Sequence, residues 1–118
     1  MITPLRILIV EDEPLIAMML EDFIEALGHK RAGTADSVAT ALPLVERGSF
    51  DAVILDVNLR GGELCWPVAD RLVEDGKPYL LASGGQAEAL PGAHATAPVL
   101  AKPFTMDGVR VALDRLAG

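Results

Sequence analysis

The chain has 118 residues, of which 51% are hydrophobic and 23% charged, and its formal net charge is −7. This length and this balance predict one soluble globular domain with a single core rather than a disordered chain. The negative charge argues against nonspecific binding to nucleic acid or to anionic membranes. No apolar stretch has the length of a membrane span or of a signal sequence, so we expect a cytoplasmic protein. Cys65 is the only cysteine, which excludes an intrachain disulfide and a cysteine-rich metal site.

The chain begins with a strand-like run followed by a helical pattern. Residues 5–10 are mostly apolar and predict a first strand. Pro14 then stands where the first turn of a helix tolerates proline, and apolar residues follow at helical spacing as far as Leu27. Gly28 is expected to end this helix. The short run 30–34 is a weaker strand candidate, and its two cations favour a place near a sheet edge.

A second helix is predicted to run toward Arg47 and to end at Gly48. Asp36 and Ser37 are both suitable residues to cap its beginning. Pro43 lies inside this helix, and because proline lacks an N–H we expect it to bend or break the helix.

The next strand is predicted at residues 50–56, where four contiguous apolar residues indicate a sheet covered on both faces. A loop over 57–64 contains two glycines. Pro67 opens a third helix that reaches about Asp75, and Gly76 ends it.

Two further strands are predicted at residues 79–83 and 99–102. Residues 84–98 between them are rich in Gly, Ala and Pro, with at most a turn of helix, and should be the softest part of the domain. Thr105 is expected to cap a last helix that carries Val109, Leu113 and Leu116 on one face.

Polar residues follow the predicted strands at their downstream ends. The alternation of strands and helices predicts an α/β fold with a parallel sheet, and open α/β sheets bind ligands at the carboxyl edge. Three carboxylates meeting there repel one another unless a cation lies among them, so the group suits a divalent metal and a phosphoryl group. The residues are Glu11, Asp12, Asp56, Ser83 and Lys102.

Four ordered segments resemble the receiver domain of two-component response regulators. They are Ile7-Leu-Ile-Val-Glu-Asp-Glu-Pro14, Ala52-Val-Ile-Leu-Asp-Val-Asn58, Leu81-Ala-Ser-Gly84 and Lys102-Pro-Phe104. The resemblance covers nearly the whole chain and implies one receiver domain over residues 1–118, with a doubly wound five-stranded parallel sheet of order 2-1-3-4-5 as in flavodoxin and CheY. It also implies phosphorylation of Asp56 by a sensor histidine kinase or a histidine phosphotransfer protein.

The resemblance further implies a Mg²⁺ site. Asp12 would bind the ion directly and Glu11 mainly through water, while Asp56 would use its second oxygen and Asn58 its backbone carbonyl. Mg²⁺ prefers octahedral oxygen coordination and usually keeps several waters, which suits such a donor set.

The phosphoryl group would be held by the two remaining polar residues. By resemblance, Lys102 would pair with Asp56 before transfer and with a phosphoryl oxygen after it, and Ser83 would donate its hydroxyl to the same group. The chain would catalyse its own phosphorylation and slow hydrolysis without being a turnover enzyme. With no DNA-binding segment after Gly118, output is expected through a downstream protein or by draining phosphate from a kinase.

The sequence departs from the commonest receiver pattern at the switch. Most receivers carry an aromatic residue three positions before the lysine, and here that residue is Val99. The run 77–85 resembles a single-domain subgroup with a PFxFATGY motif, although Ser83 replaces its threonine and Gly85 its last aromatic residue. We therefore hypothesise that Ser83 acts through residues 84–98.

Each functional residue also has a simpler interpretation. Asp12 could cap the first helix, Ser83 could be a turn residue, and Lys102 could be a solvated cation. His29 and His94 lie in predicted loops and receive no role, and Trp66 and Tyr79 are expected to be packing residues.

Other classes of protein remain open at this stage. A haloacid dehalogenase-like hydrolase also uses an aspartate at a strand end, but it requires a second acid where this chain has Asn58. A pseudo-receiver that binds proteins without being phosphorylated, and a receiver excised from a hybrid histidine kinase, are the remaining alternatives.

Overall fold

The centre of the molecule is a five-stranded parallel sheet of order β2-β1-β3-β4-β5. The computed structural model describes residues 4–83, 94, 97–101 and 103–117. The strand order and direction confirm the fold class that the sequence predicts, including the edge position of the strand with two cations. The strands are β1 (Arg6–Val10), β2 (Lys30–Ala35), β3 (Ala52–Asp56), β4 (Tyr79–Ser83) and β5 (Val99–Ala101).

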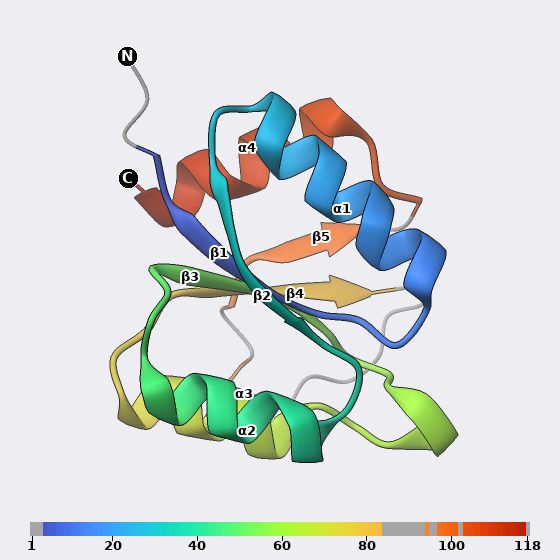
Figure 1. The fold of residues 1–118 in the computed structure, drawn as a ribbon, viewed down its shortest axis with the longest axis vertical. Coiled ribbons are helices and arrows are strands. Elements are labelled where there is room, and N and C mark those ends of the chain that lie inside the picture. The colour runs from blue at the N-terminus through green and yellow to red at the C-terminus, as the bar shows by residue number, and fades with distance from the viewer. Residues whose placement is uncertain (1–3, 84–93, 95–96, 102, 118) are drawn as a thin grey trace.

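Helices cover both faces of this sheet, as Figure 1 shows. On one face lie α1 (Pro14–Ala26) and α4 (Met106–Ala117), and on the other lie α2 (Val38–Arg47) and α3 (Trp66–Glu74). A 3₁₀ turn, η1 (Arg60–Gly62), interrupts the loop between β3 and α3. Among the described residues, no helix has the length and apolar character that crossing a bilayer requires.

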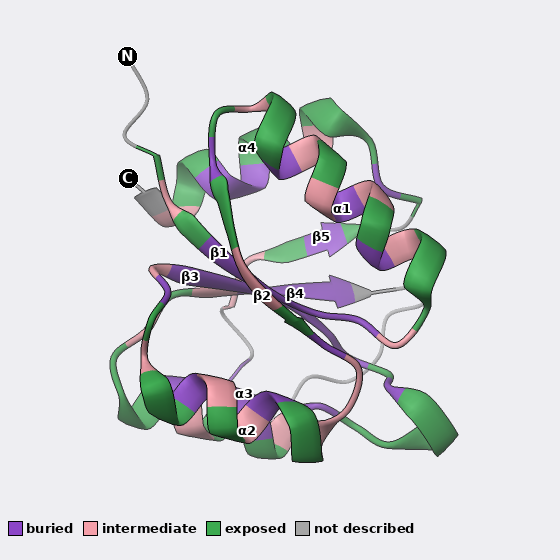
Figure 2. Cartoon of the chain, in the orientation of Figure 1, coloured by how far each residue is buried: buried purple, intermediate pink, exposed green. Residues whose placement is uncertain are grey.

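The sheet separates two hydrophobic cores because successive side chains of a strand point to opposite faces. In β1, Leu8 and Val10 pack in the core beneath α2 and α3, whereas Ile7 and Ile9 pack beneath α1 and α4. All five residues of β3 are buried, which explains its unbroken apolar run (Figure 2). With both faces apolar, polar side chains of the central strands can be placed only at the strand ends.

Local sequence signals set most of the helix boundaries. Pro14 is the first residue of α1, and Gly28 follows that helix with a positive φ of 93°. Ser37, rather than Asp36, is the N-cap of α2: its hydroxyl accepts a hydrogen bond from the Thr40 N–H at 3.1 Å. Thr105 caps α4 through a bond from the Gly108 N–H to its hydroxyl at 3.0 Å.

Of the two effects predicted for Pro43, a bend or a break, the break is wrong, because α2 continues through that residue as one helix. Proline removes only one backbone donor, and Ala41 and Val45 on the same helix are fully buried against the sheet. The apolar packing of this face holds the helix together across the missing hydrogen bond. Other strand and helix boundaries differ from the predicted ones by one or two residues, as is usual for frayed ends.

Two histidines without a predicted role are buried. His29 is 7% exposed, and its Nδ1 accepts a hydrogen bond from the Leu5 N–H at 3.0 Å. His94 is 1% exposed and contacts Trp66 and Tyr79. The two aromatic residues therefore pack as expected, but around a polar ring.

We expect Ser37→Ala to lower the free energy of unfolding by about 1 kcal/mol, because it removes the hydroxyl that caps α2. Urea unfolding followed by circular dichroism would measure the loss. Ser49→Ala is the matched control, since Ser49 is exposed just beyond the same helix and should change stability by less than about 0.5 kcal/mol. Equal effects of the two substitutions would contradict the assignment of the cap.

Candidate functional site

The parallel register brings the ends of β1 and β3 side by side. Val10 pairs with Leu55, so Glu11 directly after β1 stands next to Asp56 at the end of β3. The backbone stays hydrogen-bonded just beyond both strands: the Glu11 N–H donates to the Ala35 carbonyl at 2.9 Å, and the Val57 N–H donates to the Ala82 carbonyl at 3.1 Å. The carboxylates are thus attached to backbone that the sheet holds in place.

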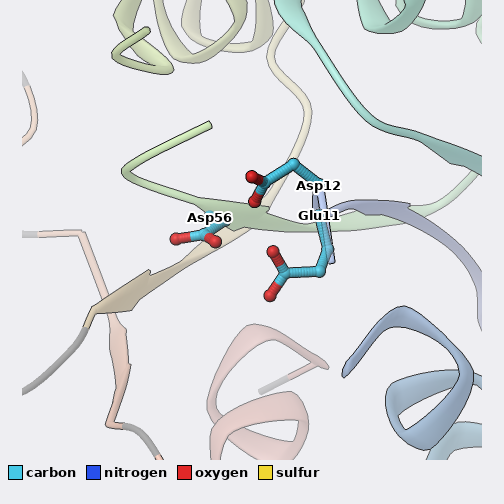
Figure 3. Close-up of side chains that lie close together, drawn as sticks. All are labelled: Glu11, Asp12 and Asp56. Carbon is cyan, nitrogen blue, oxygen red and sulfur yellow. The ribbon is translucent and has the colours of Figure 1, made fainter. Parts of the chain in front are cut away.

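Glu11, Asp12 and Asp56 converge at this edge, as Figure 3 shows. Each offers one carboxylate oxygen, and these oxygens all lie within 4.8 Å of one another. Glu11 and Asp56 are each 3% exposed, whereas Asp12 is partly exposed. The acidic cluster, as we call these three residues, is therefore open to solvent mainly on the side of Asp12.

The acidic cluster is electrostatically unfavourable by itself. Like charges at this separation repel, and burial removes water that would screen them. Two backbone amides offset part of the negative charge: the Asn58 N–H lies 3.3 Å from Asp56 Oδ1, and the Glu13 N–H lies 3.4 Å from Glu11 Oε2. A donor set made only of carboxylate oxygens suits a hard divalent cation such as Mg²⁺.

A cavity of about 360 Å³ adjoins the acidic cluster. Glu11, Asp12 and Pro14 line it from the β1 side, Thr34 and Asp36 from the end of β2, and Arg60 from the loop that follows β3. The acidic cluster can therefore be reached by a group from outside the domain.

Residues 57–65, which we call the Asp56 arm, lead from Asp56 to α3 as a hydrogen-bonded unit. Asn58 forms an isolated antiparallel bridge with Leu64, and the Cys65 N–H donates to the Val57 carbonyl at 3.0 Å. The Asp56 arm thus keeps a folded-back shape.

Two side chains fasten the Asp56 arm to the beginning of α2. Glu63 Oε1 accepts a hydrogen bond from the Val38 N–H at 2.9 Å, and Arg60 pairs with Asp36 at 3.2 Å. Sequence analysis missed both residues, because a lone Glu or Arg in a loop gives no sign of a partner far along the chain.

The remaining predicted site residues are described only in part. Ser83 ends β4, where its backbone pairs with Ala101 of β5, but its side chain lies outside the described part of the structure. Lys102 also lies outside the described residues, as does most of the segment 84–98 on which the proposed switch depends. Val99, in the position of the usual aromatic residue, is 44% exposed at the start of β5.

The simpler interpretation of Asp12 as a helix cap is wrong. The N-cap of α1 is Glu13, and no side-chain hydrogen bond caps that helix. Asp12 instead belongs to the acidic cluster, where its carboxylate lies close to two others.

Comparison with protein families shows that the family described as "Response regulator receiver domain" matches residues 7–65. Among curated proteins, the transcriptional regulatory protein TcrA of Mycobacterium tuberculosis is 33% identical over 123 residues, covering 98% of this chain and 47% of TcrA. The chain therefore spans about half the length of this curated relative.

Solved structures extend the likeness to the whole fold. SdrG from Sphingomonas melonis Fr1 is 54% identical with a TM-score of 0.87, and each chain is covered completely. A structure described as the BeF3-activated conformation of SdrG from Pseudomonas melonis Fr1 has a TM-score of 0.83 at 54% identity, covering 99% of this chain and 100% of that one. The PhyR response regulator REC domain of Erythrobacter litoralis is 32% identical with a TM-score of 0.82, covering 97% of this chain and 90% of that one.

We expect Mg²⁺ at millimolar concentration to raise the Tm of the wild type, because a cation that binds only the folded state stabilises it. Asp12→Asn should raise the Tm without Mg²⁺, since it removes one of the repelling charges, and should reduce the gain from Mg²⁺. Differential scanning calorimetry would measure both effects.

The matched control is Asp22→Asn, an exposed carboxylate on α1 away from the acidic cluster. It removes the same formal charge and should leave the gain from Mg²⁺ unchanged. If Asp12→Asn and Asp22→Asn reduced the Mg²⁺-induced gain in Tm equally, Mg²⁺ would be acting by general charge screening, and a specific site would be contradicted.

Proposed function

Because the chain belongs to the response regulator receiver domain family, we propose that it is a phosphoacceptor signalling domain in which Asp56 carries the phosphoryl group. The observation that supports this most directly is the convergence of Glu11, Asp12 and Asp56 at the carboxyl edge of the sheet. Asp56 lies at the end of a central, fully buried strand, which fixes its backbone, and one of its carboxylate oxygens lies within 4.8 Å of those of Glu11 and Asp12. A nucleophile held in this way loses little freedom when it reacts.

The reaction is a transfer from a phosphohistidine to a carboxylate. An Asp56 oxygen attacks phosphorus, the new O–P bond forms as the P–N bond breaks, and the imidazole nitrogen of the donor keeps the electron pair. Water later attacks the same phosphorus, which releases inorganic phosphate and regenerates the Asp56 carboxylate. The chain would thus catalyse its own phosphorylation and dephosphorylation rather than turn over a metabolite.

Mg²⁺ is the cofactor that we propose for this transfer. Asp12 and Asp56 would hold it through carboxylate oxygens, Glu11 mainly through water, and Asn58 through its backbone carbonyl. When bound, the ion supplies positive charge that stabilises the phosphoryl oxygens and relieves the repulsion within the acidic cluster. The hydrogen bond from the Val38 N–H to Glu63 fastens the Asp56 arm to α2, and this would keep the Asn58 carbonyl within reach of the ion.

Ser83 and Lys102 complete the proposed site. Lys102 would supply a second positive charge to Asp56 and then to the phosphoryl group, and the Ser83 hydroxyl would donate to a phosphoryl oxygen. The backbone position of Ser83 at the end of β4 supports its part, because β4 is the neighbour of β3 and Asp56 pairs with Ala82.

The partner that we propose is a sensor histidine kinase or a histidine phosphotransfer protein, with a downstream protein as target. SdrG, which is similar over its whole length, has a conformation described as BeF3-activated, and this supports activation by a phosphoryl group here. We further propose that the chain is a single receiver domain of the PFxFATGY-like subgroup acting in the cytoplasm, without binding nucleic acid or membranes. This chain covers 47% of TcrA, so any activity of a longer protein that contains such a domain is likewise only proposed.

We expect the wild type to gain one phosphoryl group when it is incubated with Mg²⁺ and phosphoramidate, whose P–N bond resembles that of phosphohistidine. Intact-mass spectrometry would detect the gain, and hydroxylamine should remove it because an acyl phosphate is an activated carboxyl derivative. Asp56→Asn should gain none, and Asp22→Asn should behave as the wild type.

Beryllofluoride with Mg²⁺ provides a second measurement that does not depend on the phosphodonor. Amide NMR signals of residues around Asp12 and Asp56 should shift in the wild type and not in Asp56→Asn. A spectrum that neither Mg²⁺ nor beryllofluoride changes would overturn the proposal and favour a pseudo-receiver that binds proteins without phosphorylation.

A further inference from the structure

A buried histidine joins α3 to β4 on the face of the sheet opposite α1 and α4. His94 is 1% exposed, its Nε2 lies 2.8 Å from Asp70 Oδ1, and its Nδ1 is hydrogen-bonded to the Tyr79 hydroxyl. Its ring stacks on Trp66 with ring centres 5.4 Å apart and planes inclined by 12°. Both nitrogen atoms and one face of the ring therefore have defined partners.

The hydrogen bonds orient the His94 ring. A carboxylate can only accept, so Nε2–H donates to Asp70, while Nδ1 shares a hydrogen bond with the Tyr79 hydroxyl. Burial raises the pKa of Tyr79, with the nearby Cys65 and Asp70 adding to the effect, so the phenol keeps its O–H proton. Directional bonds of this kind tolerate little displacement of their partners.

Trp66 links this network to the Asp56 arm. Trp66 is the first residue of α3 and directly follows Cys65, whose N–H is bonded to the Val57 carbonyl. Val57 in turn follows Asp56 and is 1% exposed, with its N–H bonded to Ala82 of β4. A movement of the Asp56 arm relative to β4 would therefore reach Trp66 on one side of His94 and Tyr79 on the other.

We propose that His94 is a positioning residue for the phosphoacceptor site, acting through Trp66 on the Asp56 arm. The inference rests on the proposed function, because it assigns to this network an effect on the affinity for Mg²⁺ and a phosphoryl group. His94 holds the start of α3 at a set distance from β4 and so holds the arm that carries Asn58. Binding at the acidic cluster, in turn, changes the Trp66–His94 stack.

Trp66 is the only tryptophan in the chain, so its fluorescence reports on this stack directly. We expect the wild-type emission to change when Mg²⁺ and then beryllofluoride are added, and this change to be absent in Asp56→Asn. Titration with Mg²⁺ and beryllofluoride gives a dissociation constant from the fluorescence and, independently, from the amide NMR signals of the acidic cluster.

Three variants separate positioning from simple packing. His94→Phe keeps a ring against Trp66 but removes both hydrogen bonds, and Tyr79→Phe removes only the hydroxyl. We expect each substitution to raise the dissociation constant for beryllofluoride in the presence of Mg²⁺ by about three- to tenfold. This is within the range that substitutions along a chain of contacting residues produce. Asp70→Asn retains an oxygen that can accept from Nε2 and should bind nearly as tightly as the wild type.

Glu74→Gln is the matched control, because it changes an exposed carboxylate on the same helix. It should leave both the affinity and the fluorescence response unchanged. Tyr79→Phe keeps the test decisive if His94→Phe does not fold, since it deletes a single oxygen from a partly buried ring.

The outcomes distinguish this inference from the proposed function. Site signals that shift with beryllofluoride, together with unchanged Trp66 emission and unchanged affinity in Tyr79→Phe and in any folded His94→Phe, would overturn the inference and leave the proposed function standing. A wild type that binds neither Mg²⁺ nor beryllofluoride would overturn both. Weaker binding in Tyr79→Phe, and in His94→Phe if it folds, would support the inference, provided that Asp70→Asn and Glu74→Gln bind as tightly as the wild type does.

Discussion

The constraint on which this structure depends is the mutual repulsion of Glu11, Asp12 and Asp56. Their oxygens approach within 4.8 Å, and two of the three residues are almost fully buried. At an effective dielectric constant of 20, two ionised carboxylates at such a distance repel by roughly 3 kcal/mol. A protein stabilised by only about 5–15 kcal/mol must hold this cluster together by other means.

The means are the two hydrophobic cores and the register of the sheet. Ile54 and Leu55 near the end of β3 are buried on opposite faces, so neither Asp56 nor its neighbours can shift without exposing apolar surface. The strand ends fix the carboxylates from behind, and the side toward Asp12 stays accessible. Stored repulsion of this kind makes a bound cation stabilising, which couples the fold to the chemistry that we propose.

A conformational change at the acidic cluster would reach the rest of the domain through the Asp56 arm. Glu63 and Arg60 fasten it to the beginning of α2, and its last residue, Cys65, leads directly into α3. The arm is short and internally hydrogen-bonded, which favours movement of its residues together. The network around His94 meets the arm at its α3 end, where Trp66 stacks on the His94 ring.

The sequence by itself determined the order of the elements and the residues at the strand ends. Apolar runs, Pro14, Gly28 and Gly48 are local signals whose effect does not depend on distant partners, and parallel strands place their carboxyl ends at one edge. Glu11, Asp12 and Asp56 could therefore be brought together without coordinates. Only the tertiary structure decided that Pro43 stays within a helix, that Ser37 rather than Asp36 caps it, and that His94 is buried between Trp66, Asp70 and Tyr79. The position of His94 depends on burial against residues 15 or more positions away, which local pattern and spacing do not encode. The choice of Ser37 depends on which of two competent caps reaches a backbone amide of the helix.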